Sequence, residues 1–279
     1  MSVDEMATDP AVHYDKVTDA WGYLLGDNLH YGYFDRGDES LTEATERLTR
    51  RMAELAQPGS ESLVLDVGCG TGEPARCLAQ WFGCRVTGIS PSQVCIDRAA
   101  EASVGSVVED LVNFELGDAM AMPYGDACYD RVWVMESSHL MPDKSRLMSE
   151  AARVLKPGGR LVLCDVMLQK HLPLLEVIRY RDDFLLLHDV FGRARMETLD
   201  FYASEAEANG LTVELREDIT AATRPTFERW RQNAEANRQE ILFHLDEADW
   251  QKFVSSCAVL ENFWDNGVLG YGLLAASRA

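Results

Sequence analysis

Residues 62–93 read SLVLDVGCGTGEPARCLAQWFGCRVTGISPSQ, with three glycines in five residues between a hydrophobic run and a helix-like run. Gly68, Gly70 and Gly72 let the backbone turn sharply, and without a Cβ their amide groups can approach a ligand closely. A second hydrophobic run, RVTGI, comes after the helix-like run. This order predicts a strand, a glycine-rich turn facing a ligand, a helix and a second strand.

The same alternation of strands and helices continues towards residue 168. Short β-rich runs occupy 112–118 (VNFELGD), 129–137 (YDRVWVMES) and 159–167 (GRLVLCDVM), and amphipathic helices are predicted from Glu73, Ser92 and Lys144. Strands that alternate with helices in this way indicate an α/β fold with a mostly parallel, doubly wound sheet. In such folds, ligands bind outside the carboxyl ends of the strands.

Hydrophobic spacing divides the chain into three predicted regions. Apolar residues recur at helical spacing before residue 60, and strand-like runs return late in the chain at TVELREDIT and VLGYGLLAASR. We expect an α-helical cap at 1–60, an α/β core at 61–170, and the rest of the core with an inserted helical lid at 171–279. The aromatic residues of the last region are predicted to be core: Trp230, Phe263, Trp264 and Tyr271.

The composition argues against several classes of partner. With 46 acidic and 26 basic residues, the formal net charge of −20 would repel nucleic-acid phosphates and an anionic membrane surface. No run reaches the roughly 18 apolar residues of a membrane span, and the N-terminus shows no signal-peptide pattern. The seven cysteines are scattered and never spaced C-x-x-C, which predicts reduced thiols in a cytoplasmic protein and no metal site.

Two departures from the dinucleotide-binding pattern predict the ligand of the glycine-rich turn. The spacing is G-x-G-x-G rather than G-x-G-x-x-G, and Asp66 precedes the glycines at the end of the strand. A pyrophosphate has no use for a carboxylate there, whereas the ammonium group of an amino acid does. We therefore predict S-adenosylmethionine (SAM), a nucleoside with an amino-acid tail, as the cofactor.

The segment LDVGCGTG resembles the first motif of class I SAM-dependent methyltransferases. This resemblance implies a Rossmann-like SAM methyltransferase fold. It also implies that Asp66, Gly68 and Gly70 contact the cofactor.

The end of the second strand reads GISPSQ, without the acidic residue that most members of this class use to bind the ribose. In this it resembles the branch that includes sterol, cyclopropane-fatty-acid and many natural-product sugar methyltransferases. The resemblance assigns Ile89 to the adenine face and Ser90 and Gln93 to the ribose. Helix capping is the alternative for Ser90 and the preferred role for Ser92.

Two further segments resemble cofactor-binding parts of this branch. LGDAMAMPY after the third strand implies an adenine site in which Asp118 accepts from the exocyclic amine, Ala119 donates its N–H and Met120 lines the base. A turn role for Asp118 and a core role for Met120 are the alternatives. In the N-terminal segment, Tyr14 is expected near the methionine part of SAM, and His30, Tyr31 and Tyr33 at the substrate mouth.

The chemistry is predicted from the ends of the fourth and fifth strands. ESSHLMPD carries Glu136 and His139, and LVLCDV carries Asp165 at the same edge of the sheet. A carboxylate beside a histidine fixes the tautomer and raises the basicity of the ring, which suits a general base. The pair resembles the His–Asp pair of natural-product sugar O-methyltransferases. A structural role is the alternative for His139, and for Glu136 a bracing role is an equal alternative.

We therefore expect a SAM-dependent methyltransferase that acts on a hydroxyl of a small secondary metabolite, with His139 as base and no metal. One alternative is methylation of carbon on a prenyl diphosphate or other alkene. Another, of a different class, is a SAM-binding protein that steers a cyclisation or acts as a regulatory subunit. Neither the acceptor nor the oligomeric state follows from the sequence, and a homodimer stays open.

Overall fold

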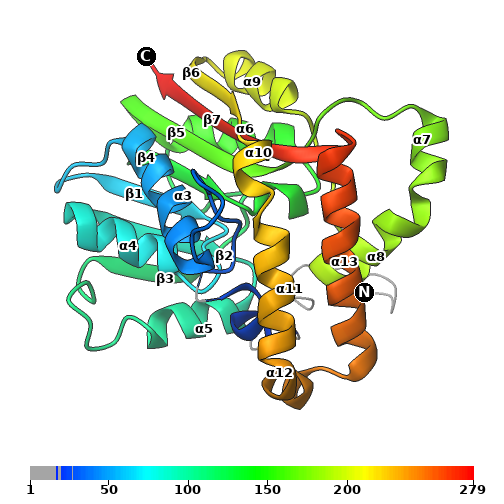
Figure 1. The fold of residues 1–279 in the computed structure, drawn as a ribbon. Helices are drawn as coiled ribbons and strands as arrows, with labels where there is room; N and C mark the ends of the chain where they lie inside the picture. Colours follow the sequence, from blue (N-terminus) through cyan, green and yellow to red (C-terminus); the bar gives the residue numbers. More distant parts are fainter. Residues whose placement is uncertain (1–16, 18–19, 27) are drawn as a thin grey trace, which may run out of the picture.

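A computed structural model describes residue 17, residues 20–26 and residues 28–279, and Figure 1 shows their arrangement around one sheet. The seven strands lie in the order β3-β2-β1-β4-β5-β7-β6, and within this sheet β7 alone runs opposite to the other six strands. Their bounds are β1 Leu63–Val67, β2 Arg85–Ser90, β3 Val112–Leu116, β4 Tyr129–Met135, β5 Leu155–Leu168, β6 Leu211–Asp218 and β7 Leu269–Arg278. The predicted mostly parallel α/β sheet is confirmed.

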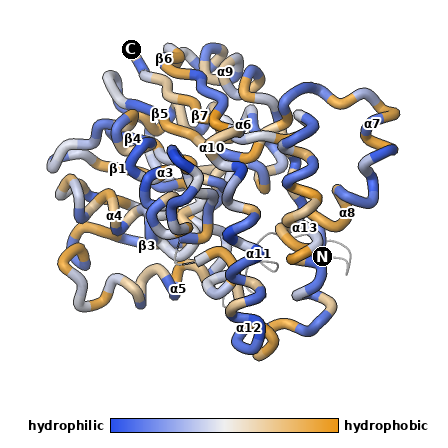
Figure 2. The backbone as a smooth tube through the Cα atoms, in the orientation of Figure 1, coloured by the Kyte–Doolittle hydropathy of each residue, from blue (hydrophilic) through white to orange (hydrophobic). Residues whose placement is uncertain are grey.

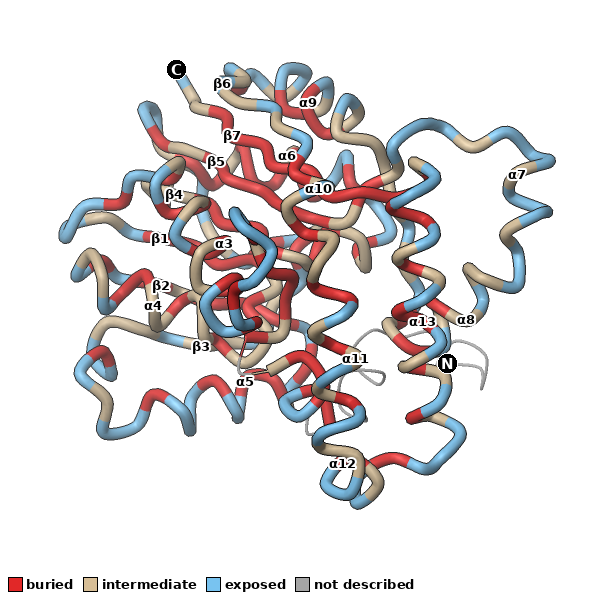
Figure 3. Tube along the Cα trace, viewed as in Figure 1, coloured by how far each residue is buried: buried red, intermediate tan, exposed pale blue. Residues whose placement is uncertain are grey.

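Successive residues of the central strands face opposite sides of the sheet, so each side has its own hydrophobic core. In β1, Val64 packs with α3 (Leu41–Ala56) and α4 (Glu73–Phe82), whereas Leu65 packs with α6 (Lys144–Val154) and α9 (Leu199–Ala208). This two-residue period is the ordinary geometry of a strand buried on both faces. The sheet centre is accordingly buried along its length in Figure 3.

The predicted amphipathic helix before β1 is present as α3. Ser40 caps it and forms a capping box with Glu43, so two of the backbone groups at the helix start are satisfied. Leu41, Leu48 and Met52 on its inner face are buried. The helix α5 (Gln93–Glu101) follows β2, and a short 3₁₀ helix, η1 (Ser138–Leu140), follows β4.

The second half of the chain adds a group of helices beside the sheet (Figure 1). They are α7 (Leu174–Arg179), α8 (Arg181–Phe191), α10 (Thr220–Thr223), α11 (Thr226–Ala236), α12 (Arg238–His244) and α13 (Glu247–Asp265). The last four lie in sequence between β6 and β7, so the chain leaves the sheet and returns to it. Trp230, Phe263, Trp264 and Tyr271 are all buried, as the sequence predicts.

No helix in the described part of the chain is both long enough and apolar enough to span a bilayer.

Candidate functional site

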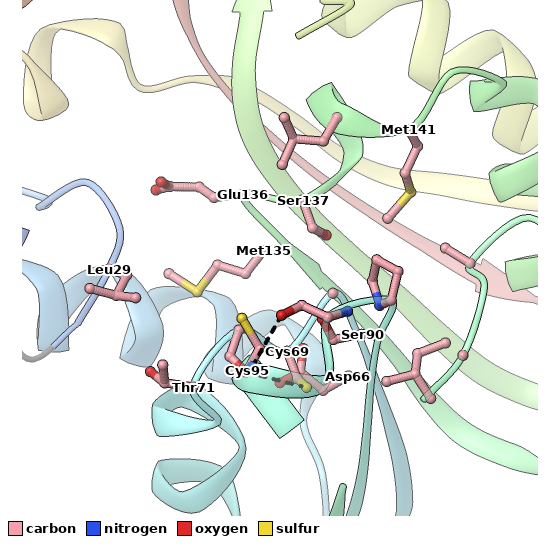
Figure 4. A pocket seen from close by; sticks show the side chains of 18 of the residues that line it. Leu29, Asp66, Cys69, Thr71, Ser90, Cys95, Met135, Glu136, Ser137 and Met141 are labelled. Atoms are coloured by element: carbon pink, nitrogen blue, oxygen red, sulfur yellow. Dashed lines mark hydrogen bonds between the residues drawn. The ribbon is translucent and has the colours of Figure 1, made fainter. Parts of the chain in front are cut away.

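The carboxyl ends of β1, β2, β3 and β4 meet at one edge of the sheet, where the loops that follow them enclose a cavity of about 440 Å³. Figure 4 shows side chains of the β1, β2 and β4 ends gathered around this cavity, which we call the cofactor cavity. The position of the cavity at this edge follows from the sheet topology, because neighbouring parallel strands all end at the same edge.

The glycine-rich turn forms one wall of the cofactor cavity through its backbone. Gly68 has φ +80°, and a Cβ there would lie 2.3 Å from the Cβ of Ser137, so only glycine fits between the two loops. Gly70 has φ +52°, and a Cβ there would meet no atom within 4 Å. The turn therefore brings bare backbone to the cavity, as a closely approaching ligand requires.

Asp66 lies at the end of β1 and lines the cofactor cavity with 2 % of its surface exposed. Its Oδ2 has no hydrogen-bond partner among the described residues, and burial raises the pKa of the carboxyl to about 7. An ionised carboxylate without a partner is costly in such a place. A cationic ligand group would supply the missing partner, so the site fits the ammonium group of SAM.

The residues at the end of β2 and just after it differ in whether they face the cavity or the solvent. Ile89 and Ser90 are buried and line the cavity, and the Ser90 Oγ accepts from the Ser92 N–H at 3.2 Å. Ser92 also lines it and caps α5, since its Oγ accepts from the Cys95 N–H at 3.1 Å.

Gln93 departs from the expected arrangement. It is exposed on the first turn of α5, it is not part of the cavity wall, and its Nε2 donates to Asp97 Oδ1 at 2.7 Å. The structure therefore does not bring Gln93 to the cofactor cavity. The reason is that the helix starts at Gln93 itself, and the first turn directs this side chain towards a partner one turn later.

The loop after β3 places Asp118, Ala119 and Met120 on the cavity wall. Asp118 Oδ1 accepts from the Met120 N–H at 2.8 Å, which is the turn role considered as an alternative. This bond engages one carboxylate oxygen, and the side chain is exposed at the cavity rim. Both a turn role and contact with a bound base are compatible with this geometry.

His139 and Asp165 form a close pair on neighbouring strand ends. His139 Nδ1 lies 2.7 Å from Asp165 Oδ1, and the His139 N–H donates to Asp165 Oδ2 at 2.9 Å. Ser138 Oγ donates to the same Oδ2 at 2.5 Å. Asp165 is fully buried, yet the charge of His139 and these hydrogen bonds outweigh the burial penalty and lower the pKa of its carboxyl. The carboxylate therefore holds Nδ1 and leaves Nε2 of His139 without a partner among the described residues.

Glu136, directly after β4, has a strained backbone with φ +47° and lines two cavities. Its Oε1 accepts from the Tyr31 N–H at 2.8 Å and from the Tyr271 hydroxyl at 2.5 Å. Burial raises the pKa of this carboxyl to about 8. Glu136 thus ties the N-terminal segment and the last strand to the site, in agreement with a bracing role.

The second cavity, of about 80 Å³, adjoins the cofactor cavity and is called here the inner pocket. Leu29 and Glu136 belong to both walls. The other lining residues are Trp21, Leu25, Tyr31, His139, Val166, Phe184, Leu187, His188, Phe191, Ala194, Met196, Trp230, Leu260 and Leu269. The wall of the inner pocket is thus predominantly apolar. Its polar residues include His139 and Glu136, and Glu136 also lines the cofactor cavity.

The four residues singled out in the N-terminal segment have different outcomes. Tyr31 lines the inner pocket, where its ring stacks on Trp264 with centroids 5.6 Å apart. Tyr33 lines none of the three cavities. Its backbone N–H donates to the carbonyl oxygen of Ala44 in α3, which holds this part of the chain beside that helix. His30 lines the cofactor cavity rather than the substrate mouth. Tyr14 lies outside the described residues.

Sequence reasoning missed several wall residues. Met135 and Ser137 adjoin the predicted Glu136, and Ser137 Oγ donates to Val67 O at 2.7 Å, which joins the β1 and β4 loops. Met135 and Ser137 could have been found from the sequence, because they are the direct neighbours of the predicted Glu136. The wall residues from α8 and α11 had no such signal, because their helical pattern also fits an ordinary core. Among the described residues, no cluster of three or more His, Cys, Asp or Glu side chains could hold a metal ion.

Comparisons with known proteins agree with this geometry. Residues 65–163 match the family described as a methyltransferase domain. The chain is 38% identical over 266 residues to 27-O-demethylrifamycin SV methyltransferase of Amycolatopsis mediterranei, covering 95% of both chains. It is 35% identical over 231 residues to methyltransferase GfsG of Streptomyces halstedii, covering 80% of both. The crystal structure of the [4+2]-cyclase SpnF has a TM-score of 0.83 at 28% identity, covering 98% of this chain and 96% of that one.

Proposed function

Because this chain belongs to the class I SAM-dependent methyltransferases, among enzymes that methylate natural products, we propose that it methylates a hydroxyl group with His139 as general base. The observation that carries this proposal is the 2.7 Å contact between His139 Nδ1 and Asp165 Oδ1, with the ring on the wall of the inner pocket. The acceptor is a small, largely apolar secondary metabolite.

The residues of the cofactor cavity are assigned by their chemistry. Asp66 binds the ammonium group of SAM, and the backbone of Gly68 and Gly70 gives its amino-acid tail close approach. Ile89 packs on the adenine, and Ser90 lies on the ribose side. SAM, when bound, supplies a methyl group already activated on a sulfonium sulfur.

The adenine is assigned to the loop after β3, with Asp118 and Ala119 as polar contacts and Met120 against the base. Leu29 and His30 close the cavity from the N-terminal side. The region 1–60 is accordingly proposed as a cap, 61–170 as the SAM-binding core, and the helices within 171–279 as the acceptor lid. This division is supported by the two cavities, whose walls are drawn mainly from 61–170 and from 171–279 respectively.

His139 has the arrangement that proton removal needs. Asp165 accepts a hydrogen bond from Nδ1–H, so the proton of the neutral ring stays on Nδ1 and Nε2 carries the lone pair for the acceptor. As the acceptor oxygen forms its bond to the methyl carbon, the carbon–sulfur bond breaks and the hydroxyl proton passes to Nε2. The products are the methyl ether, S-adenosylhomocysteine (SAH) and protonated His139, which returns its proton to solvent.

The relatives and the pocket support the choice of acceptor. One relative's name specifies O-methylation of 27-O-demethylrifamycin SV, and the apolar inner pocket suits a hydrophobic metabolite better than a charged one. The described wall of the inner pocket contains no Lys or Arg, so it offers no cation for the diphosphate that the carbon-methylation alternative requires.

The test replaces His139 by Ala and measures methylation of 27-O-demethylrifamycin SV or of a hydroxylated macrolactone panel. We expect kcat to fall about 10²–10⁴-fold, the usual contribution of a general base. The Kd for SAH should stay within about threefold, because His139 lies on the acceptor side. His244→Ala is the matched control, since His244 is exposed and borders neither cavity. Retention of wild-type kcat in His139→Ala would refute the assignment of the base.

A second candidate function is supported by the 28% identity to SpnF, which is titled a [4+2]-cyclase. In that case the chain would bind SAM and use the apolar inner pocket to fold a polyene for cyclisation. The two functions differ in their products. Release of one SAH per acceptor supports methyl transfer, whereas acceptor conversion at constant mass without SAH supports cyclisation.

A further inference from the structure

We propose that the acceptor extends beyond the inner pocket and that its non-reacting, apolar part binds in a cleft beneath α7 and α8. This inference rests on the proposed function, because it assumes that the reacting hydroxyl lies beside His139. It adds the size and polarity of the acceptor and assigns a binding role to residues of α7 and α8. We call this site the outer cleft.

The volumes of the two cavities indicate that the inner pocket alone is too small for the acceptor. It holds about 80 Å³, whereas sites for drug-sized ligands usually hold about 300–1,000 Å³. The outer cleft has about 520 Å³. An acceptor larger than a single small ring would therefore have to continue into another space.

The outer cleft adjoins the inner pocket, because the two walls share side chains. Phe184, His188, Ala194 and Met196 belong to both walls. The inner pocket in turn shares Leu29 and Glu136 with the cofactor cavity. The three cavities therefore form one series, with His139 on the middle one. A hydroxyl beside His139 would leave the rest of its molecule pointing past Phe184 and Met196.

The lining of the outer cleft defines the chemistry of its ligand. Besides the shared Phe184 and Met196, it contains Leu168, Leu172, Val177 and Leu185. Arg181 and Glu197 are its formally charged side chains among the described residues, and their opposite signs cancel, while His171 and His188 add two imidazole rings to the wall. The cleft therefore suits an uncharged hydrocarbon body, such as the chain or ring of a polyketide, rather than a phosphate or a carboxylate.

The helix α7 has the properties of a wall that is incomplete without a ligand. None of its residues is buried, and Leu174, Leu175, Val177 and Ile178 are all exposed. Figure 2 shows hydrophobic residues on this helix, which stands apart from the body of the protein in Figure 1. Val177 lines the cleft, whereas Leu175 does not. An apolar ligand in the cleft would bury Val177 and stabilise the position of α7.

The experiment measures binding of 4-ethylphenol and 4-octylphenol by equilibrium dialysis in saturating SAH. Each carries a hydroxyl for the inner pocket, and only the longer one can reach the outer cleft. 4-Octylphenol has six more methylenes, and each strengthens binding by up to about fourfold when it is buried. With partial burial of the chain we expect about 100-fold tighter binding of 4-octylphenol. Equal affinities, or no binding of either phenol, would overturn the proposal.

A matched pair of variants locates the binding. Val177→Glu should weaken 4-octylphenol binding at least 10-fold and leave 4-ethylphenol unchanged, because it places a charge on the cleft wall. Leu175→Glu, on the same helix but off the cleft, should change neither. Equal weakening by both variants would contradict the assignment. Val177→Ala, which removes only part of the wall, provides a milder test should the Glu variant fold poorly.

The binding assay separates this inference from the proposed function. It needs no methyl transfer, so loss of the O-methyltransferase assignment would leave its result intact. If 4-octylphenol binds with the expected dependence on Val177 but is not methylated, the outer cleft stands and the chemistry at His139 must be revised. If methylation is found and the two phenols bind alike, the outer cleft is wrong and the base assignment survives.

Discussion

The cofactor cavity and the inner pocket lie next to each other, yet their walls consist of different kinds of residues. The cofactor cavity combines bare backbone at Gly68 and Gly70 with one buried carboxylate, Asp66, all within the single stretch 66–70. The inner pocket is made mainly of large apolar side chains from segments as distant as Trp21 and Leu269.

This contrast agrees with the ligands proposed for the two sites. A fixed cofactor with a charged tail can be held by backbone geometry and one opposite charge, both of which a short motif encodes. A hydrophobic acceptor is selected by the shape of an apolar space, which arises only when distant helices pack together. The two sites should therefore respond to different substitutions, and the predictions below test that separation.

The largest effect on cofactor affinity is expected for Asp66→Asn. The amide has the same size but cannot pair with the ammonium group, so the Kd for SAH should rise about 10–100-fold. In the wild type, SAH affinity should fall as pH drops below about 7, because protonation of Asp66 removes the charge; the Asn variant should lose this dependence. Calorimetric titrations between pH 5 and 8 measure both effects.

Asp66→Asn should also change the stability of the free protein, in the opposite direction. The pKa of Asp66 is raised in the fold, so the wild type loses stability as pH rises towards about 7, and the variant should be spared this loss. Its Tm at pH 8 should thus exceed that of the wild type. Asp97→Asn is the control, because Asp97 is exposed and pairs with Gln93 away from the cavity. Weaker SAH binding in the control would argue against a specific role for Asp66.

A smaller effect is expected for Gly70→Ala, and Gly105→Ala is its matched control. Both glycines have positive φ, +52° and +71°, and at both an added Cβ would meet no atom within 4 Å. Both variants should therefore lose about 1 kcal/mol of stability from backbone strain. Only Gly70→Ala should weaken SAH binding, by about 10-fold, since Gly70 borders the cofactor cavity and Gly105 does not. Similar SAH affinities in the two variants would show that backbone access at Gly70 is unimportant.

Tyr202→Phe tests whether a residue of the second half of the chain positions the reacting pair. The Tyr202 hydroxyl lies 2.8 Å from Ser138 Oγ, which donates to Asp165. Its removal should lower kcat about 3–10-fold and leave SAH binding unchanged. Tyr124→Phe is the control, because it also removes a hydrogen-bonded tyrosine hydroxyl, one that donates to Glu115 away from the pair. A lower SAH affinity in Tyr202→Phe would instead indicate a general structural loss.

The smallest effect is expected for Glu136→Gln, and it concerns stability. The pKa of Glu136 is raised from 4.5 to about 8 by burial. The unfolded chain therefore releases this proton at lower pH than the folded one, and the wild type loses stability between about pH 4.5 and 8. Gln keeps an oxygen for the Tyr31 N–H and the Tyr271 hydroxyl but does not titrate. The variant should thus gain about 2–6 °C in Tm relative to wild type on going from pH 5 to pH 8, and parallel Tm curves would refute this.

The accuracy of prediction from sequence follows the same division. The order of strands and helices, the parallel sheet and the buried aromatic residues are confirmed. The structure also brings His139 and Asp165 together, because His139 follows β4 and Asp165 lies in the neighbouring β5, directly after the pairing of Met135 with Cys164. Gln93 and Tyr33 are the exceptions. Each lies close in sequence to a site residue, but a local partner, Asp97 or Ala44, holds it elsewhere.

The sequence by itself determined the α/β fold, the cofactor and the strand ends on which the chemistry is proposed, because hydrophobic period and glycine spacing are local properties of the chain. Only the tertiary structure decided how large the acceptor site is and which helices enclose it. The helices α8, α11 and α13 have hydrophobic faces that would suit any core, and whether such a face fills a core or leaves a cavity depends on how it packs against partners far away in sequence.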